Sequence, residues 1–191
     1  MLWTYIAVPA PSTTDHVVIS EFAPQGPGGA ADEFIELYNP TSEEVDLSGW
    51  KVQYKSGSGP SYFSYELPAG SRIAPHGFFL VASAGYTGFV GADANWGGSL
   101  SLSADPARGG HVRLGRPGIG SSPADPLAVD TVGYGPANAP EGSAFPTLPV
   151  ANGSFERKAW SDSTDGTMES GPHASHGNGF DSNDNSQDFL L

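Results

Sequence analysis

Hydrophobic and polar residues alternate in short stretches along this chain, with the period of two that is typical of a β-strand. Residues 32–50 read DEFIELYNPTSEEVDLSGW. Here Phe34 and Tyr38 fall on one face of an extended segment, and Ile35 and Leu37 fall on the other. The Asn, Pro, Thr and Ser that follow favour a turn. The segment therefore predicts two strands joined by a tight turn.

The same alternation recurs through the chain. It predicts strands near residues 3–8, 17–22, 33–39, 51–56, 62–67, 78–82, 100–103, 111–114, 128–134 and 154–159. Gly- and Pro-rich stretches separate these strands, and no window repeats apolar residues at helical spacing for three turns. We therefore predict an all-β sandwich, with Trp50 and Phe155 buried inside it.

The first predicted strand stands apart from the others. Residues 1–16 form an N-terminal extension, an apolar strand followed by a Pro-rich hinge, whereas residues 17–191 form the main domain. The apolar stretch is too short to span a membrane and lacks the basic flank of a secretory signal. Such a strand needs a sheet edge, in its own sandwich or in a second subunit, unless it is a leader outside the fold. The side chains expected to bind that edge are Trp3, Tyr5 and Ile6.

Several sequence blocks are similar to one known family. The blocks ISEF, EFIELYNPT and DLSGW, followed by GHVRL, VDTVGYG, GSFERK and DNSQDF, resemble the lamin tail domain family in its bacterial branch. The resemblance covers residues 17–189 and implies an immunoglobulin-like β-sandwich without a catalytic centre of its own. It also implies a role in interaction, adhesion or assembly, but it fixes no ligand.

Composition narrows the possible partners. The chain has 191 residues, no Cys, and a net charge of -13 from eight Lys and Arg against 21 Asp and Glu. The lack of Cys excludes thiol catalysis, thiolate metal sites and disulfides. Because nucleic-acid binding and docking to an anionic membrane both need clustered cations, neither is expected. The acidic surface favours a soluble, self-repelling protein.

One acidic run near the C-terminus could bind calcium. Asp181, Asn183, Asn185 and Asp188 offer alternating oxygen ligands within eight residues. However, the Gly and Glu that complete a helix-flanked calcium loop are missing. The alternative is a turn in which Asn and Asp bond their own backbone and lead Phe189 back into the sandwich.

Other candidate chemistry is weak. His173 and His176 are three residues apart in a Gly-rich stretch, which favours an exposed loop over a metal site. The adjacent acids at 32–33 and 43–44 are expected to be solvated turn residues, because paired-carboxylate catalysis needs two groups held apart across a cleft. No nucleophile, phosphate-loop or zinc-protease motif is present, so we do not expect an enzyme.

Aromatic residues near predicted loops could bind a sugar or a protein, although alternation places one of each pair in the core. They are Tyr62, Phe63, Tyr65, Tyr86, Phe89 and Trp96. The long loops at 86–98 and 115–126 are the natural places for a ligand or partner.

Two functions remain. The first is a noncatalytic extracellular or cell-surface module for adhesion or self-assembly with copies of itself, as a filament subunit if strand exchange joins the copies. The second is a calcium- or carbohydrate-binding accessory domain of a secreted protein.

Overall fold

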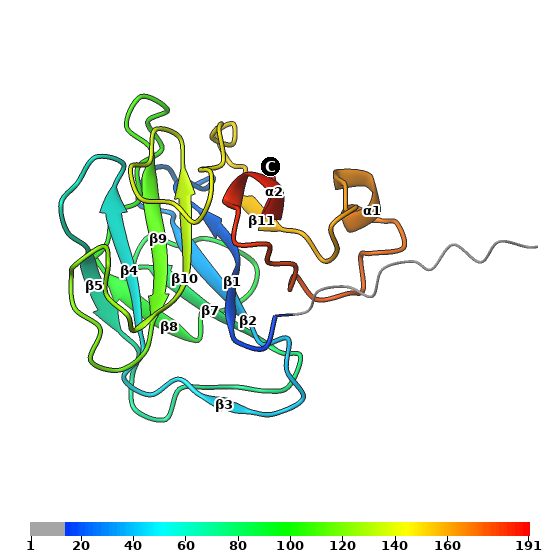
Figure 1. Cartoon of the computed structure of the whole chain (residues 1–191), viewed down its shortest axis with the longest axis horizontal. Helices are drawn as coiled ribbons and strands as arrows, with labels where there is room; N and C mark the ends of the chain where they lie inside the picture. Colours follow the sequence, from blue (N-terminus) through cyan, green and yellow to red (C-terminus); the bar gives the residue numbers. More distant parts are fainter. Residues whose placement is uncertain (1–13) are drawn as a thin grey trace, which may run out of the picture.

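The computed structural model describes residues 14–191, and the strand predicted at residues 3–8, with Trp3, Tyr5 and Ile6, lies outside them. Two β-sheets pack face to face, and the C-terminal part of the chain, with the two short helices, lies at one side of them (Figure 1). The predicted two-sheet β-sandwich is confirmed.

The larger sheet has six strands in the order β12-β11-β1-β2-β7-β8. All neighbouring strands are antiparallel except β7 and β8, which are parallel. The bounds are β1 (Val18–Ala23), β2 (Phe34–Tyr38), β7 (Phe78–Ser83), β8 (Ala94–Gly97), β11 (Phe155–Arg157) and β12 (Phe189–Leu190).

The second sheet has four antiparallel strands in the order β10-β9-β4-β5, and a two-stranded ribbon joins β3 to β6. The bounds are β3 (Val45–Asp46), β4 (Lys51–Ser56), β5 (Phe63–Glu66), β6 (Arg72–Ile73), β9 (Gly110–Gly115) and β10 (Ala128–Tyr134). The helices are α1 (Asp165–Glu169) and α2 (Asn185–Asp188).

An aromatic cluster fills the core between the sheets. The ring of Phe22 in β1 stacks on Phe155 at a centroid distance of 4.5 Å and tilts against Tyr134 of β10 at 5.4 Å. Phe189 of β12 meets Phe22 edge-on at 6.2 Å. All four side chains are at most 2% exposed, so the C-terminal strand β12 and the first described strand β1 contribute to the same core.

The turn after β3 does not bury the residue that the sequence favoured. The expectation that Trp50 is almost fully buried is wrong, because its side chain is only partly buried at the border of the core. Leu47, three residues earlier, is 0% exposed and lies in the core. Gly49, with φ of 75°, supplies the left-handed turn between them.

The predicted strand at residues 100–103 is also wrong, although its apolar residues are buried. Leu100 and Leu102 lie in irregular chain, and the Leu102 amide donates to the Glu33 carboxylate instead of to a neighbouring strand. Within the loop expected to be irregular at 86–98, β8 adds a parallel edge strand beside β7.

Candidate functional site

Three glutamates stand in a row across the outer face of the six-stranded sheet. Glu21 of β1 lies opposite Glu36 of β2 on one side and opposite Glu156 of β11 on the other. Their neighbours Phe22 and Ile35 point into the core, so the alternation of each strand places its glutamate on the other face. The row thus brings together carboxylates from three segments that are distant in the sequence.

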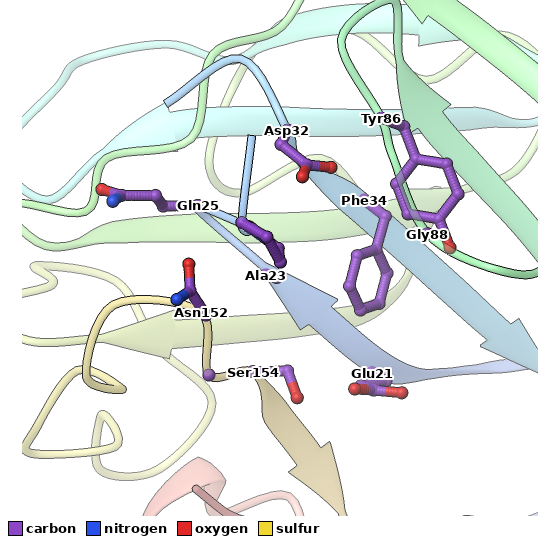
Figure 2. A pocket seen from close by; sticks show the side chains of 12 residues that line it. Glu21, Ala23, Gln25, Asp32, Phe34, Tyr86, Gly88, Asn152 and Ser154 are labelled. Atoms are coloured by element: carbon purple, nitrogen blue, oxygen red, sulfur yellow. The ribbon is translucent and has the colours of Figure 1, made fainter. Parts of the chain in front are cut away.

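The row borders a pocket of about 180 Å³. Figure 2 shows the side chains of Phe34 and Tyr86 on one side of the pocket, with Gln25 and Asn152 across the view from them. The two rings meet edge-on, with a centroid distance of 5.9 Å. Glu21 lines the same pocket and lies below Phe34 in this view.

Burial controls the electrostatics of this row. It raises the pKa of Glu21 to about 7, although a hydrogen bond with Ser154 opposes the shift. Burial raises the pKa of Glu36 as well, and its Oε1 accepts a hydrogen bond from Ser20 at 2.8 Å. Among the described residues, no Lys, Arg or His forms an ion pair with Glu21, Glu36 or Glu156.

Asp32 shapes the rim of the pocket. Its carboxylate accepts hydrogen bonds from the amide and hydroxyl of Thr87 and from the amide of Gly28. These bonds tie together two loops and fix Tyr86, which precedes Thr87. With an exposed fraction of 2% each, Asp32 and Glu33 contradict the expectation that the acids at 32–33 are solvated. Burial raises the pKa of Glu33 to about 7.

The four residues of the predicted calcium site lie near one another, but the structure shows a helical turn there. Asn185 is 0% exposed, and its side-chain amide bonds the backbones of Thr131, Gly133 and Glu141. One oxygen of Asp188 accepts two hydrogen bonds from Ser182. These side chains attach α2 to β10 and to its own turn.

Asp181 and Asn183 occupy the outer part of the same turn. Asp181 accepts a hydrogen bond from the Asn183 amide and lies 3.5 Å from the Arg157 guanidinium. Among residues 14–191, no three His, Cys, Asp or Glu side chains come together in an arrangement that could hold a metal ion. Calcium binding by Asp181, Asn183, Asn185 and Asp188 stays a prediction.

Arg157 has a structural role. Its side chain is 0% exposed and donates to the Asp130 carboxylate at 2.7 Å and to the Ile19 carbonyl at 2.7 Å. It also donates to the Phe180 carbonyl, and its guanidinium lies 4.7 Å from the centre of the Phe189 ring. One arginine therefore joins β1, β10, β11 and the closing strand.

The segment that contains His173 and His176 is not the exposed loop that was expected. His173 is only 5% exposed and bonds the Ser163 hydroxyl through Nδ1 at 3.0 Å, whereas His176 is exposed. Trp160 lies against both imidazoles at centroid distances of 4.5 and 4.7 Å. The stretch is an ordered turn around a tryptophan.

The aromatic residues near the predicted loops divide into buried and exposed ones, as the alternation predicted. Tyr62 and Trp96 are buried, whereas Phe63 and Phe89 are exposed and Tyr86 borders the pocket. The loop at 115–126 is held against the second sheet because Arg113 donates to its carbonyls at Gly120 and Ser122. No described helix is long and apolar enough to cross a membrane.

Sequence reasoning missed the glutamate row. Each of the three glutamates directly follows or precedes a buried apolar residue in its strand, which is the signal in the sequence. That signal cannot show that the three are neighbours, because β11 is more than one hundred residues from β2 and their register is set by tertiary packing.

Comparison with known proteins identifies the fold. A DUF4876 family protein from Bacteroides thetaiotaomicron VPI-5482 has a similar structure, with a TM-score of 0.55 and 12% sequence identity over 92% of this chain and 70% of that chain. No curated protein sequence matches. The family model of the Lamin Tail Domain matches residues 10–135, well over half of the chain. The sandwich is therefore immunoglobulin-like, and the chain belongs to the lamin tail domain family.

Proposed function

We propose that this protein is a noncatalytic interaction module that assembles with copies of itself, outside the cell or at its surface. In this proposal the apolar segment at residues 3–8 of one copy adds a strand to a sheet edge of the next copy. The observation that carries the proposal is the edge of the second sheet at β5, which pairs with β4 on one side and with no other strand among the described residues.

The β5 edge has the features of an acceptor. Its four residues leave backbone donors and acceptors on the outer side, which is the template that strand addition uses. Phe63 is 68% exposed there, while Tyr65 packs partly against the core. An added strand with aromatic residues at alternate positions would cover Phe63 and extend the sheet.

The positions of β1 and β5 in different sheets favour exchange between copies. β1 lies in the six-stranded sheet, whereas β5 is the far edge of the other sheet. The hinge at residues 9–13 spans at most about 18 Å when fully extended. A segment that reaches β5 of a second copy makes a head-to-tail contact, and such a contact propagates as a filament when it does not close into a ring.

The noncatalytic part of the proposal is supported by the position of the serine and histidine that most resemble catalytic groups. Ser163 and His173 are bonded to each other, but they are only 3% and 5% exposed. The Ser163 oxygen also accepts a hydrogen bond from the Trp160 amide. Both groups therefore contribute to the packing around Trp160, and a substrate would have to open that packing to reach them.

The test is a comparison of particle mass by light scattering. Full-length protein is expected to form multimers, whereas protein lacking residues 1–11 and the Phe63→Lys variant are expected to be monomeric and folded. Phe89→Lys is the matched control, because Phe89 is fully exposed in the segment between β7 and β8, outside β5, and should leave assembly unchanged. Monomers from the full-length chain, or multimers that persist after the deletion, would contradict strand exchange.

A second candidate, an accessory domain that binds carbohydrate, is favoured by one observation. The rings of Phe34 and Tyr86 border a pocket that also contains the amides of Gln25 and Asn152. Flat rings and amide groups are what a sugar requires. Calcium binding by the turn at 181–188 belongs to the same proposal.

A further inference from the structure

The pocket beside Phe34 and Tyr86 combines aromatic faces with negative charge that nothing in the described chain neutralises. Glu21 lines the pocket, and Glu36 and Glu156 flank it on the neighbouring strands. Like charges directly opposite each other on a sheet repel. A positive group in the pocket would relieve this repulsion.

The aromatic side chains make the pocket suitable for an organic cation. A ring face attracts an ammonium or guanidinium group, and a carboxylate binds the same group through charge-assisted hydrogen bonds. Tyr86 is held in place by the Thr87 and Asp32 bonds, so its ring is a fixed wall. The volume of about 180 Å³ accommodates an alkyl stem with one charged head.

We propose that this pocket binds an organic cation, an ammonium or guanidinium group on an apolar stem. Glu21 receives the charged head, the rings of Phe34 and Tyr86 contact the stem and the head, and Gln25 and Asn152 bond polar groups at the rim. The site is independent of strand addition at β5, because it lies on the outer face of the other sheet.

Other ligands suit the pocket less well. A metal ion needs several free oxygens, but the carboxylate of Asp32 already accepts three hydrogen bonds. An anion would add to the negative charge of the row. A neutral sugar could stack on the rings, but it would leave the repulsion between Glu21 and its neighbours in place.

The proposal includes a pH dependence. The charged groups around Glu21 are Glu36 and Glu156 on the adjacent strands and Asp32 at the rim, with the Tyr86 ring beside them. Because the pKa of Glu21 is about 7, its carboxylate is mostly protonated in mild acid and charged above neutrality. Binding of a permanent cation should therefore tighten between about pH 6 and about pH 8.

The experiment titrates the full-length protein by NMR with 1,5-diaminopentane and with N-acetyl-lysine methylamide. N-acetyl-norleucine methylamide and glucose serve as uncharged probes, and Ca²⁺ as the metal probe. Glu21→Gln and Tyr86→Leu should each weaken amine binding about tenfold or more, whereas the exposed Glu43→Gln should change it by less than about twofold. Thermal melting confirms that each variant is folded.

The outcomes separate the ligands. Tighter binding of the lysine derivative identifies a peptide side chain as the ligand, and tighter binding of the diamine identifies a free amine; both support the proposal. Three results would overturn it: uncharged probes that bind as tightly as the amines, Glu21→Gln protein that binds like the wild type, or Ca²⁺ that outcompetes every amine at Glu21. None of these results depends on whether the protein assembles.

Discussion

At the scale of single residues, Arg157 is a charged side chain with a structural role. It is fully buried between Asp130, Asp181 and Asp188, with nitrogen–oxygen distances of 2.7, 3.5 and 3.9 Å. A buried charge is tolerated only when partners replace the water that it loses. Here the carboxylates and two backbone carbonyls provide that replacement.

Replacing Arg157 by Met should destabilise the fold severely. The variant leaves Asp130 buried without its cation, which costs about 3 to 5 kcal/mol of unfolding free energy. Urea denaturation measures the loss. Lys158→Met is the matched control, since Lys158 is only partly buried and should change stability by less than about 1 kcal/mol. Equal stability of the two variants would refute the role of Arg157.

Residue burial was only partly predictable. The sequence identified Phe155 as a core residue but overestimated the burial of Trp50, because apolar size says nothing about which side of a turn faces the core. The expectation that Asp32 and Glu33 are solvated was wrong because the sequence does not show which groups surround them. Their burial depends on amides from Gly28, Thr87 and Leu102, and only the folded chain brings these amides to the carboxylates.

At the scale of elements, the glutamate row gives the sandwich a pH-dependent stability. The pKa of Glu21 rises from 4.5 to about 7 on folding, so between these values the folded state binds more protons than the unfolded state. The corresponding stability is complete below pH 4.5 and disappears as the pH rises through about 7. Its size is on the order of 3 kcal/mol.

Glu21→Gln should remove this dependence. The variant is expected to be more stable than the wild type at about pH 8, where it no longer buries a charge, and to differ little at about pH 5. Urea denaturation at the two pH values checks this, with Glu43→Gln as an exposed control. A variant that is destabilised equally at both values would show that Glu21 acts through packing.

The hydrogen bonds of the turn at residues 181–188, before β12, lead to a prediction about calcium. Because Asn185 and Asp188 already bond the backbones of β10 and of their own turn, adding Ca²⁺ or EDTA should shift the melting temperature by less than about 2 °C. A larger rise with Ca²⁺ would show that Asp181 and Asn183 recruit a metal despite these bonds, and would favour the accessory-domain function.

Element prediction worked for long strands and failed for short ones. β4 and β10 have the predicted bounds and contain six and seven residues. β3, β6 and β12 have two residues each and exist because a neighbouring strand pairs with them, which no local pattern shows. The pocket was missed for the same reason, since β1, β2 and the segment before β11 meet only in the folded sheet.

At the scale of the whole molecule, the surface is strongly acidic. Lys55, Arg113 and Arg157 are 0% exposed and four acids, Asp32, Glu33, Asp130 and Asp188, are at most 2% exposed, so five Lys and Arg face 17 Asp and Glu outside the buried set. The remaining acids repel one another across the surface, and this repulsion opposes the compact state.

Added salt should therefore stabilise the protein. Raising NaCl from about 0.01 M to about 0.15 M shortens the screening length from about 30 Å to about 8 Å, and the melting temperature should rise by several degrees. Calorimetry at the two salt concentrations measures the change. A melting temperature that falls would mean that attractive ion pairs, such as Arg72 with Glu44, outweigh the repulsion.

The positions of the Lys and Arg residues also determine where trypsin, which cuts after Lys and Arg, can cleave the native protein. Residues 1–50 and 159–191 contain no Lys or Arg, so trypsin has no cleavage site within these two stretches. Arg116 precedes a proline, whose ring blocks the cut. Arg108 lies in an exposed turn and is the natural first point of cleavage, so the folded protein would divide there into two fragments while the residues at both ends remain attached.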